Sequence, residues 1–108
     1  MAKFKGTFKC VLMTPDALLY EKEVRSVFLT GDTGEYELLS YHYPLIGILK
    51  ESYVIFDWKE SYPIKFGIVK FFANECIILV EEKERLKQKR EKKESGIAVQ
   101  DADQKNII

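Results

Sequence analysis

The residues able to perform chemistry are few and scattered along the chain of 108 residues. His42 is the only histidine, which excludes a zinc site built from several histidines. Cys10 and Cys76 lie in apolar runs without CxxC spacing, which favours two reduced, buried thiols over a disulfide or a reactive thiol. The glycine-containing segment 31–34 lacks the lysine of a P-loop and opens no helix. We therefore predict no catalytic residues, no metal site and no cofactor.

The composition restricts the class of protein. Hydrophobic residues (46%) and aromatic residues (13%) predict a folded chain, while 31% charged residues exclude a bilayer-embedded one. Lys plus Arg and Asp plus Glu both number 17, so a formal net charge of zero gives no global attraction to nucleic acid. The sequence has neither a secretory signal nor a run of about 18 apolar residues that would span a membrane. We expect a soluble, cytosolic protein with no direct membrane insertion.

Hydrophobic residues recur with a period of two from residue 4 to residue 80, which is typical of strands with one buried face. In the first run, Phe8, Cys10 and Leu12 share the apolar side. Seven or more such runs, separated by closely spaced turns, predict a mainly β fold, an antiparallel β-sandwich of short strands over residues 1–82.

Two pairs of these runs have the pattern of hairpins. The first expected turn, 59–61, joins the runs 53–58 and 62–66, and the second, 73–75, joins the runs 68–72 and 76–80. Pro63 falls inside one of the runs, and because proline cannot donate a ladder hydrogen bond, that strand is expected at an edge or to be irregular.

The composition changes abruptly at Glu81. Residues 81–94 hold seven basic and five acidic side chains, with Leu86 the only apolar one. High helix propensity and i,i+4 charge pairs predict a helix, but one without an apolar stripe to pack against the sandwich. We therefore divide the chain into a sandwich, 1–82, and a charged helix with a flexible tail, 83–108.

The segment 34–46 is the most unusual in the chain, with three tyrosines, a histidine and a proline. One interpretation is structural: Gly34 supplies a permissive backbone angle, Pro44 fixes the turn, and His42 hydrogen-bonds local backbone. The other is that a partner binds this loop, since Tyr and His combine apolar area with a polar tip.

The segment resembles the signature G-E-[FLI]-x-[IVL]-L-P-x-H-x-P-[LI] of the N-terminal β-sandwich of the epsilon subunit of F-type ATP synthase, called delta in mitochondria. The resemblance covers about residues 4–82. Further elements agree in order: Phe8 to Thr14-Pro15, the run Val24, Val27 and Leu29, the pair Leu49-Lys50, and Gly67 followed by Phe71, Asn74, Cys76, Ile78 and Leu79. Ser40 and Tyr41 depart from the signature, and one charged segment stands where the family usually has two C-terminal helices.

The resemblance implies a non-catalytic subunit of the central stalk of a proton- or sodium-translocating ATP synthase. Such a subunit binds the gamma subunit and the c-ring, couples c-ring rotation to the catalytic head, and lies on the cytoplasmic side, peripheral to the inner (cell) membrane. The C-terminal helix is a further candidate contact to the catalytic head. By position, the residues at the c-ring end of the sandwich would be Gly34, Glu35, Tyr36, Leu38, His42, Pro44 and Leu45.

Two other classes of function are considered. A stand-alone β-sandwich module would use its cationic helical tail to bind an acidic protein, with acidic neighbours arguing against strong nucleic-acid binding. A small hydrolase or thiol enzyme would use His42 with Cys10 or Cys76. Exposed aromatics are candidate gamma contacts, namely Tyr41, Tyr43 and Trp58, although an aromatic on a strand is more often part of the core.

Overall fold

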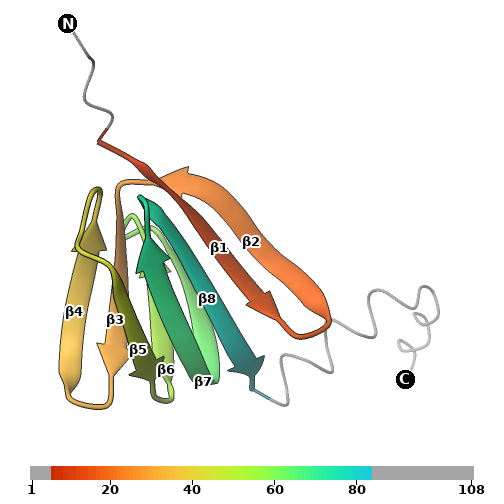
Figure 1. Ribbon diagram of the computed structural model, residues 1–108. Helices are drawn as coiled ribbons and strands as arrows, with labels where there is room; N and C mark the ends of the chain where they lie inside the picture. The colour runs from red at the N-terminus through yellow and green to blue at the C-terminus, as the bar shows by residue number, and fades with distance from the viewer. Residues whose placement is uncertain (1–5, 84–108) are drawn as a thin grey trace, which may run out of the picture.

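The computed structural model describes residues 6–83, which form eight strands in one strongly coiled sheet (Figure 1). The strands are β1 (Phe8–Thr14), β2 (Ala17–Val24), β3 (Ser26–Gly31), β4 (Gly34–Leu39), β5 (Leu45–Leu49), β6 (Ser52–Phe56), β7 (Glu60–Phe72) and β8 (Glu75–Glu82). Their order in the sheet is β2-β1-β8-β7-β5-β3-β4, and β6 pairs with β3 and β7. The mainly β sandwich is confirmed, whereas the expected helix and tail of 83–108 lie outside the described residues, except for Lys83.

The sheet becomes a sandwich because β7 is shared between its two layers. The first half of β7 pairs with β6 and the second half with β5, and its register with β8 shifts between Ile64 and Phe66. Figure 1 shows β7 passing from the rear layer to the front one. β2 consequently lies over β6, where the rings of Tyr20 and Phe56 stack with centroids 3.9 Å apart.

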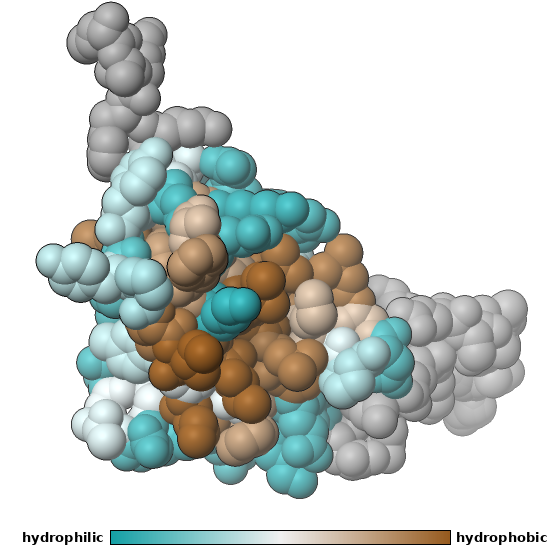
Figure 2. Space-filling view, in the orientation of Figure 1, coloured by the Kyte–Doolittle hydropathy of each residue, from teal (hydrophilic) through white to brown (hydrophobic). Residues whose placement is uncertain are grey.

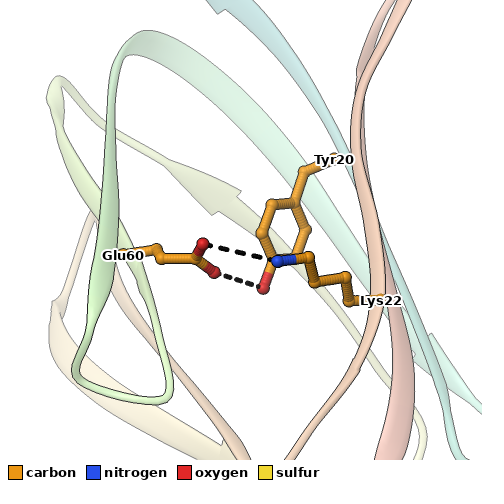
Figure 3. A network of polar contacts seen from close by, with 3 residues as sticks. All are labelled: Tyr20, Lys22 and Glu60. Carbon is orange, nitrogen blue, oxygen red and sulfur yellow. Dashed lines mark hydrogen bonds and ion pairs between the residues drawn. The ribbon is translucent and has the colours of Figure 1, made fainter.

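Polar contacts hold β2 to the start of β7 across the two layers. Glu60 accepts a hydrogen bond of 3.0 Å from the Tyr20 hydroxyl and forms a 3.4 Å ion pair with Lys22 (Figure 3). Burial, together with the nearby Glu60 carboxylate, raises the pKa of the Tyr20 phenol above its usual value.

Two details of the predicted sandwich are wrong. The runs 62–66 and 68–72 form one 13-residue strand, β7, with Gly67 in its middle. Glycine stands there because a Cβ at this position would lie 3.0 Å from Val80 Cγ1, and the residue does not interrupt the strand. The sheet is also not purely antiparallel, since β1 and β8 pair in parallel. Alternation of apolar residues identifies a buried face but carries no information about strand direction.

The core is one cluster drawn from all eight strands. Phe8, Cys10 and Leu12 are buried on one side of β1, as their alternation predicts. Cys10 lies directly opposite Cys76 in the β1–β8 ladder, and both thiols are free and fully buried, which confirms the predicted reduced pair. A hydrogen bond with Cys76, together with burial, raises the pKa of the Cys10 thiol, which disfavours the reactive thiolate.

Both expected hairpins are present. The β7–β8 turn falls at Ala73 and Asn74, which have φ values of 52° and 60°. The β6–β7 turn begins earlier than expected, at Asp57, whose Oδ1 accepts hydrogen bonds from the backbone N–H groups of Arg25 (2.6 Å) and Ser26 (3.1 Å). Pro63 pairs with Tyr53 of β6 but lies before the β8 ladder begins, which agrees with the expected irregular strand.

No helix within residues 6–83 is long and apolar enough to cross a bilayer.

Candidate functional site

The seven residues predicted to lie at one end of the sandwich are distributed over two ends of β4. Gly34 and Glu35 follow the tight β3–β4 turn, at the bottom of Figure 1, where Gly31 pairs with Gly34. His42 and Pro44 lie in the loop after β4 ends at Leu39. The structure does not bring all seven residues to one end, because a strand advances about 3.3 Å per residue, so neighbours in sequence become distant in space.

The β3–β4 turn presents polar and acidic groups to solvent. Asp32, Thr33, Gly34 and Glu35 are all exposed. Gly34 has a φ of 143°, which side-chain-bearing residues rarely adopt, so glycine is required for this turn. The turn is therefore a small, well-defined polar projection.

Three of the predicted site residues pack against or within the core. Leu38 is fully buried, while Tyr36 and Leu45 are partly buried and pack against the core. A Cβ on Gly31 would lie 3.1 Å from Tyr36 Cε1, and a Cβ on Gly47 would lie 3.0 Å from the Tyr36 hydroxyl oxygen. The tyrosine ring thus occupies a slot between two glycines, and burial raises the pKa of its hydroxyl.

The loop between β4 and β5 is held by the β7–β8 turn. Asn74 Oδ1 accepts a 2.6 Å hydrogen bond from the Tyr41 backbone N–H, and Asn74 Nδ2 donates a 3.1 Å hydrogen bond to the carbonyl oxygen of Thr7. His42 Nδ1 lies 2.7 Å from the carbonyl oxygen of Tyr43, and its ring is 5.8 Å from that of Phe71. The structural interpretation of His42, a bond to local backbone, is therefore confirmed.

A surface that the sequence interpretation missed covers β5, β7 and β8. Their register places the outward side chains of these strands side by side. Figure 2 shows them as a brown area in the middle of the view, with a hydrophilic side chain inside it. We call this the outer apolar face, and its residues are Ile46, Ile48, Ile68, Phe72, Ile77 and Leu79.

Exposure on this face is large for apolar side chains. Ile46 is 75% exposed and Phe72 is 59% exposed. At one end the face continues into a groove lined by Pro44, Ile46 and Phe72 among others, so the His42 loop borders it. The available sequence signal was the run 45–49, in which both alternating sides are apolar instead of one.

The three candidate aromatics are all exposed, Tyr43 by 83% and both Tyr41 and Trp58 by 58%. The general preference of strand aromatics for the core does not apply to them, because these residues lie in turns or loops and not on strands. The Trp58 indole N–H donates a 2.8 Å hydrogen bond to Glu37, and its ring lies 4.9 Å from that of Phe28.

The described residues offer surfaces for binding and no assembled chemistry. No group of three or more His, Cys, Asp or Glu side chains in residues 6–83 is arranged to hold a metal ion. The His42 ring contacts Tyr43 and Phe71 at the surface, while both thiols lie in the core. The fold and these surfaces define a small β-sandwich domain with an exposed apolar face.

Comparison with known proteins gives the family. Residues 7–86 match the family described as ATP synthase, Delta/Epsilon chain, beta-sandwich domain, and the chain belongs to this family. The resemblance inferred from the 34–46 signature is thereby confirmed.

Relatives and a solved structure agree with this assignment. The ATP synthase epsilon chain of Nitratiruptor sp. is 33% identical over 79 residues, covering 69% of this chain and 61% of the relative. The Chlorobium limicola epsilon chain is 30% identical over 86 residues, covering 76% and 98%. A chain of the Tetrahymena thermophila mitochondrial ATP synthase, in a structure of its central stalk and c-ring, has the same fold, with a TM-score of 0.61, 16% identity and coverage of 86% and 77%. This chain thus spans about three fifths of the Nitratiruptor relative.

Proposed function

We propose that this chain is the epsilon subunit of the central stalk of an ATP synthase, a non-catalytic subunit that couples c-ring rotation to the catalytic head. The observation that carries the proposal is the outer apolar face on β5, β7 and β8, which is exposed in this member of the family. On this proposal the protein works at the cytoplasmic side of the inner (cell) membrane, as a peripheral part of the complex, and the coupling ion is a proton or sodium.

The outer apolar face is the proposed gamma-binding surface. Soluble monomers rarely expose large contiguous apolar patches. Burying such a patch against a partner lowers the free energy by about 25 cal/mol per Å² of apolar area. On the opposite side of β7, Val69 and Phe71 are fully buried in the core. A close-packed core makes the face stiff, which suits a subunit that must carry torque without bending. The His42 loop, which borders the face, belongs to this contact.

The β3–β4 turn is the proposed c-ring contact. It is polar and narrow, and Glu35 at its edge is exposed. Polar, charged side chains suit contact with the polar loops that the family's c-ring presents. Because the turn and the outer apolar face occupy different parts of the sandwich, the two partners bind at the same time. Contact with the catalytic head through 83–108 is a further part of the proposal that falls outside the described structure, except for Lys83.

Co-expression with the gamma subunit of the same organism tests the proposal. The full chain should elute with gamma from size-exclusion chromatography as a stable 1:1 complex. Separate elution at micromolar concentrations would contradict the proposal and leave a β-sandwich module with another partner.

A further inference from the structure

A single lysine interrupts the outer apolar face. Lys70 is exposed on β7, where its register partners are Ile46 on β5 and Ile77 on β8. Along β7 itself, the outward neighbours on either side are Ile68 and Phe72. Apolar side chains therefore flank Lys70 on both neighbouring strands and on both sides along β7. The ammonium group is thus placed within the face and not at its rim.

Lys70 also differs from other strand lysines in lacking a carboxylate partner within residues 6–83. Three other lysines on strands are each paired with a glutamate on another strand. These pairs are Lys9 with Glu21 (3.2 Å), Lys22 with Glu60 (3.4 Å) and Lys65 with Glu81 (3.8 Å). The acidic residue beside the apolar face, Glu75, is paired with Lys9 at 3.7 Å. The sandwich itself therefore leaves the Lys70 charge uncompensated.

The position of Lys70 matters once a partner covers the face. A lysine ammonium taken out of water without a counter-charge is strongly unfavourable, whereas a paired one is tolerated. An entirely apolar partner would therefore be penalised at Lys70, while a partner with a matching carboxylate would be favoured and fixed in register.

We propose that the surface of the gamma subunit that covers the outer apolar face carries a carboxylate that pairs with Lys70. This inference rests on the proposed gamma binding and adds the chemistry of the partner to it. Surrounding apolar contacts exclude water from the pair and so strengthen it. Lys70 thereby selects one partner and one register on a face that is otherwise sequence-tolerant.

Titration of the full chain against gamma by calorimetry tests the pair. Lys70→Met keeps the length and apolar stem of the side chain and removes its charge, so affinity should fall ~10-fold and its salt dependence should weaken. Lys70→Glu should reduce affinity further, ~100-fold, because it places like charges together. Lys59→Met is the matched control, since Lys59 is an exposed lysine in the β6–β7 turn, away from the face, and should bind as the wild type does.

The outcomes separate the inference from the proposal on which it rests. Because Lys70 is exposed, Lys70→Met should unfold at the wild-type temperature, and a loss of affinity then reports binding alone. If the wild type binds gamma and Lys70→Met binds as tightly or more tightly, the ammonium reaches solvent past the partner and the inference is overturned. If the wild type binds no gamma, the proposed function and this inference both fail.

Discussion

The outer apolar face and the β3–β4 turn are opposite in chemical character although both belong to the same sheet. The face is apolar, and behind it Val69 and Phe71, on the other side of β7, are fully buried. The turn is acidic and projects from a tight reversal that requires Gly34. The difference indicates two contacts of different physical type: a durable one driven by apolar burial and a polar one sensitive to salt.

The largest expected effect comes from placing a charge on the outer apolar face. Ile46→Glu should reduce gamma affinity ~100-fold or more, because the covered face would hold an unpaired carboxylate. The variant should remain folded, since Ile46 is 75% exposed. Tyr53→Glu, at a 52% exposed position on β6, is the matched control. Gamma affinity is measured by calorimetry. Equal losses of affinity for the two variants would show that the outer apolar face does not differ from the rest of the surface in gamma binding.

The polar turn should give a smaller effect on a different partner. Glu35→Lys should weaken association with the c-ring ~10-fold and leave gamma affinity unchanged, since a reversed charge at a polar contact changes both its attraction and its salt dependence. His42→Ala should weaken gamma binding and leave association with the c-ring unchanged, because the His42 loop borders the outer apolar face. Co-purification of each variant with gamma and with the c-ring checks this, and a c-ring defect in His42→Ala equal to that of Glu35→Lys would merge the two contacts into one.

The His42 loop, which borders the outer apolar face, is held by hydrogen bonds of the Asn74 side chain, and stability measurements can determine their contribution. Asn74→Gly keeps the positive φ of residue 74 but removes the two hydrogen bonds to Tyr41 and Thr7, so unfolding free energy should drop by about 1 kcal/mol. Asn74→Asp retains the acceptor for the Tyr41 N–H and should lose less. Urea unfolding of both variants decides the point, and an equal loss would mean that the side-chain acceptor does not hold the His42 loop.

The last prediction concerns the slot between Gly31 and Gly47 that the Tyr36 ring occupies. Gly47→Ala brings a methyl group to 3.0 Å from the Tyr36 hydroxyl and should destabilise the fold by about 1 kcal/mol. In a Tyr36→Phe background the same change should be neutral or stabilising by about 0.5 kcal/mol, because the hydroxyl is gone and alanine restricts the unfolded chain. A double-mutant cycle by urea unfolding measures the coupling. Identical effects in the two backgrounds would show that Tyr36 does not occupy the slot tightly.

Much of the fold follows from the sequence because burial on one side of a strand leaves a period of two. Phe8, Cys10 and Leu12 were assigned to the core by alternation, and all three are buried. The parallel β1–β8 pairing was not accessible in this way, since the same alternation results whichever way a neighbouring strand runs. Gly67 likewise looked like an interruption and instead continues β7, where Val80 leaves no room for a side chain.

The candidate site was predictable in composition but not in arrangement. The signature in 34–46 identified Glu35 and His42, yet their closeness along the chain concealed that they lie at opposite ends of β4. The outer apolar face escaped notice because Ile46 and Ile68 are isoleucines, which strand patterns place in cores by default. Only pairing of β5, β7 and β8 brings such residues together on one surface, and that pairing is long-range information.

Site-specific photocrosslinking in the assembled ATP synthase tests the central claim most directly. A photoreactive benzoylphenylalanine would be introduced in place of Ile46, Tyr53 or Glu35, one position at a time in the full chain. The proposal predicts a crosslink to gamma from position 46, none to gamma from position 53, and a crosslink to the c-ring from position 35. A gamma crosslink from position 53 with none from position 46 would contradict the assignment of the outer apolar face.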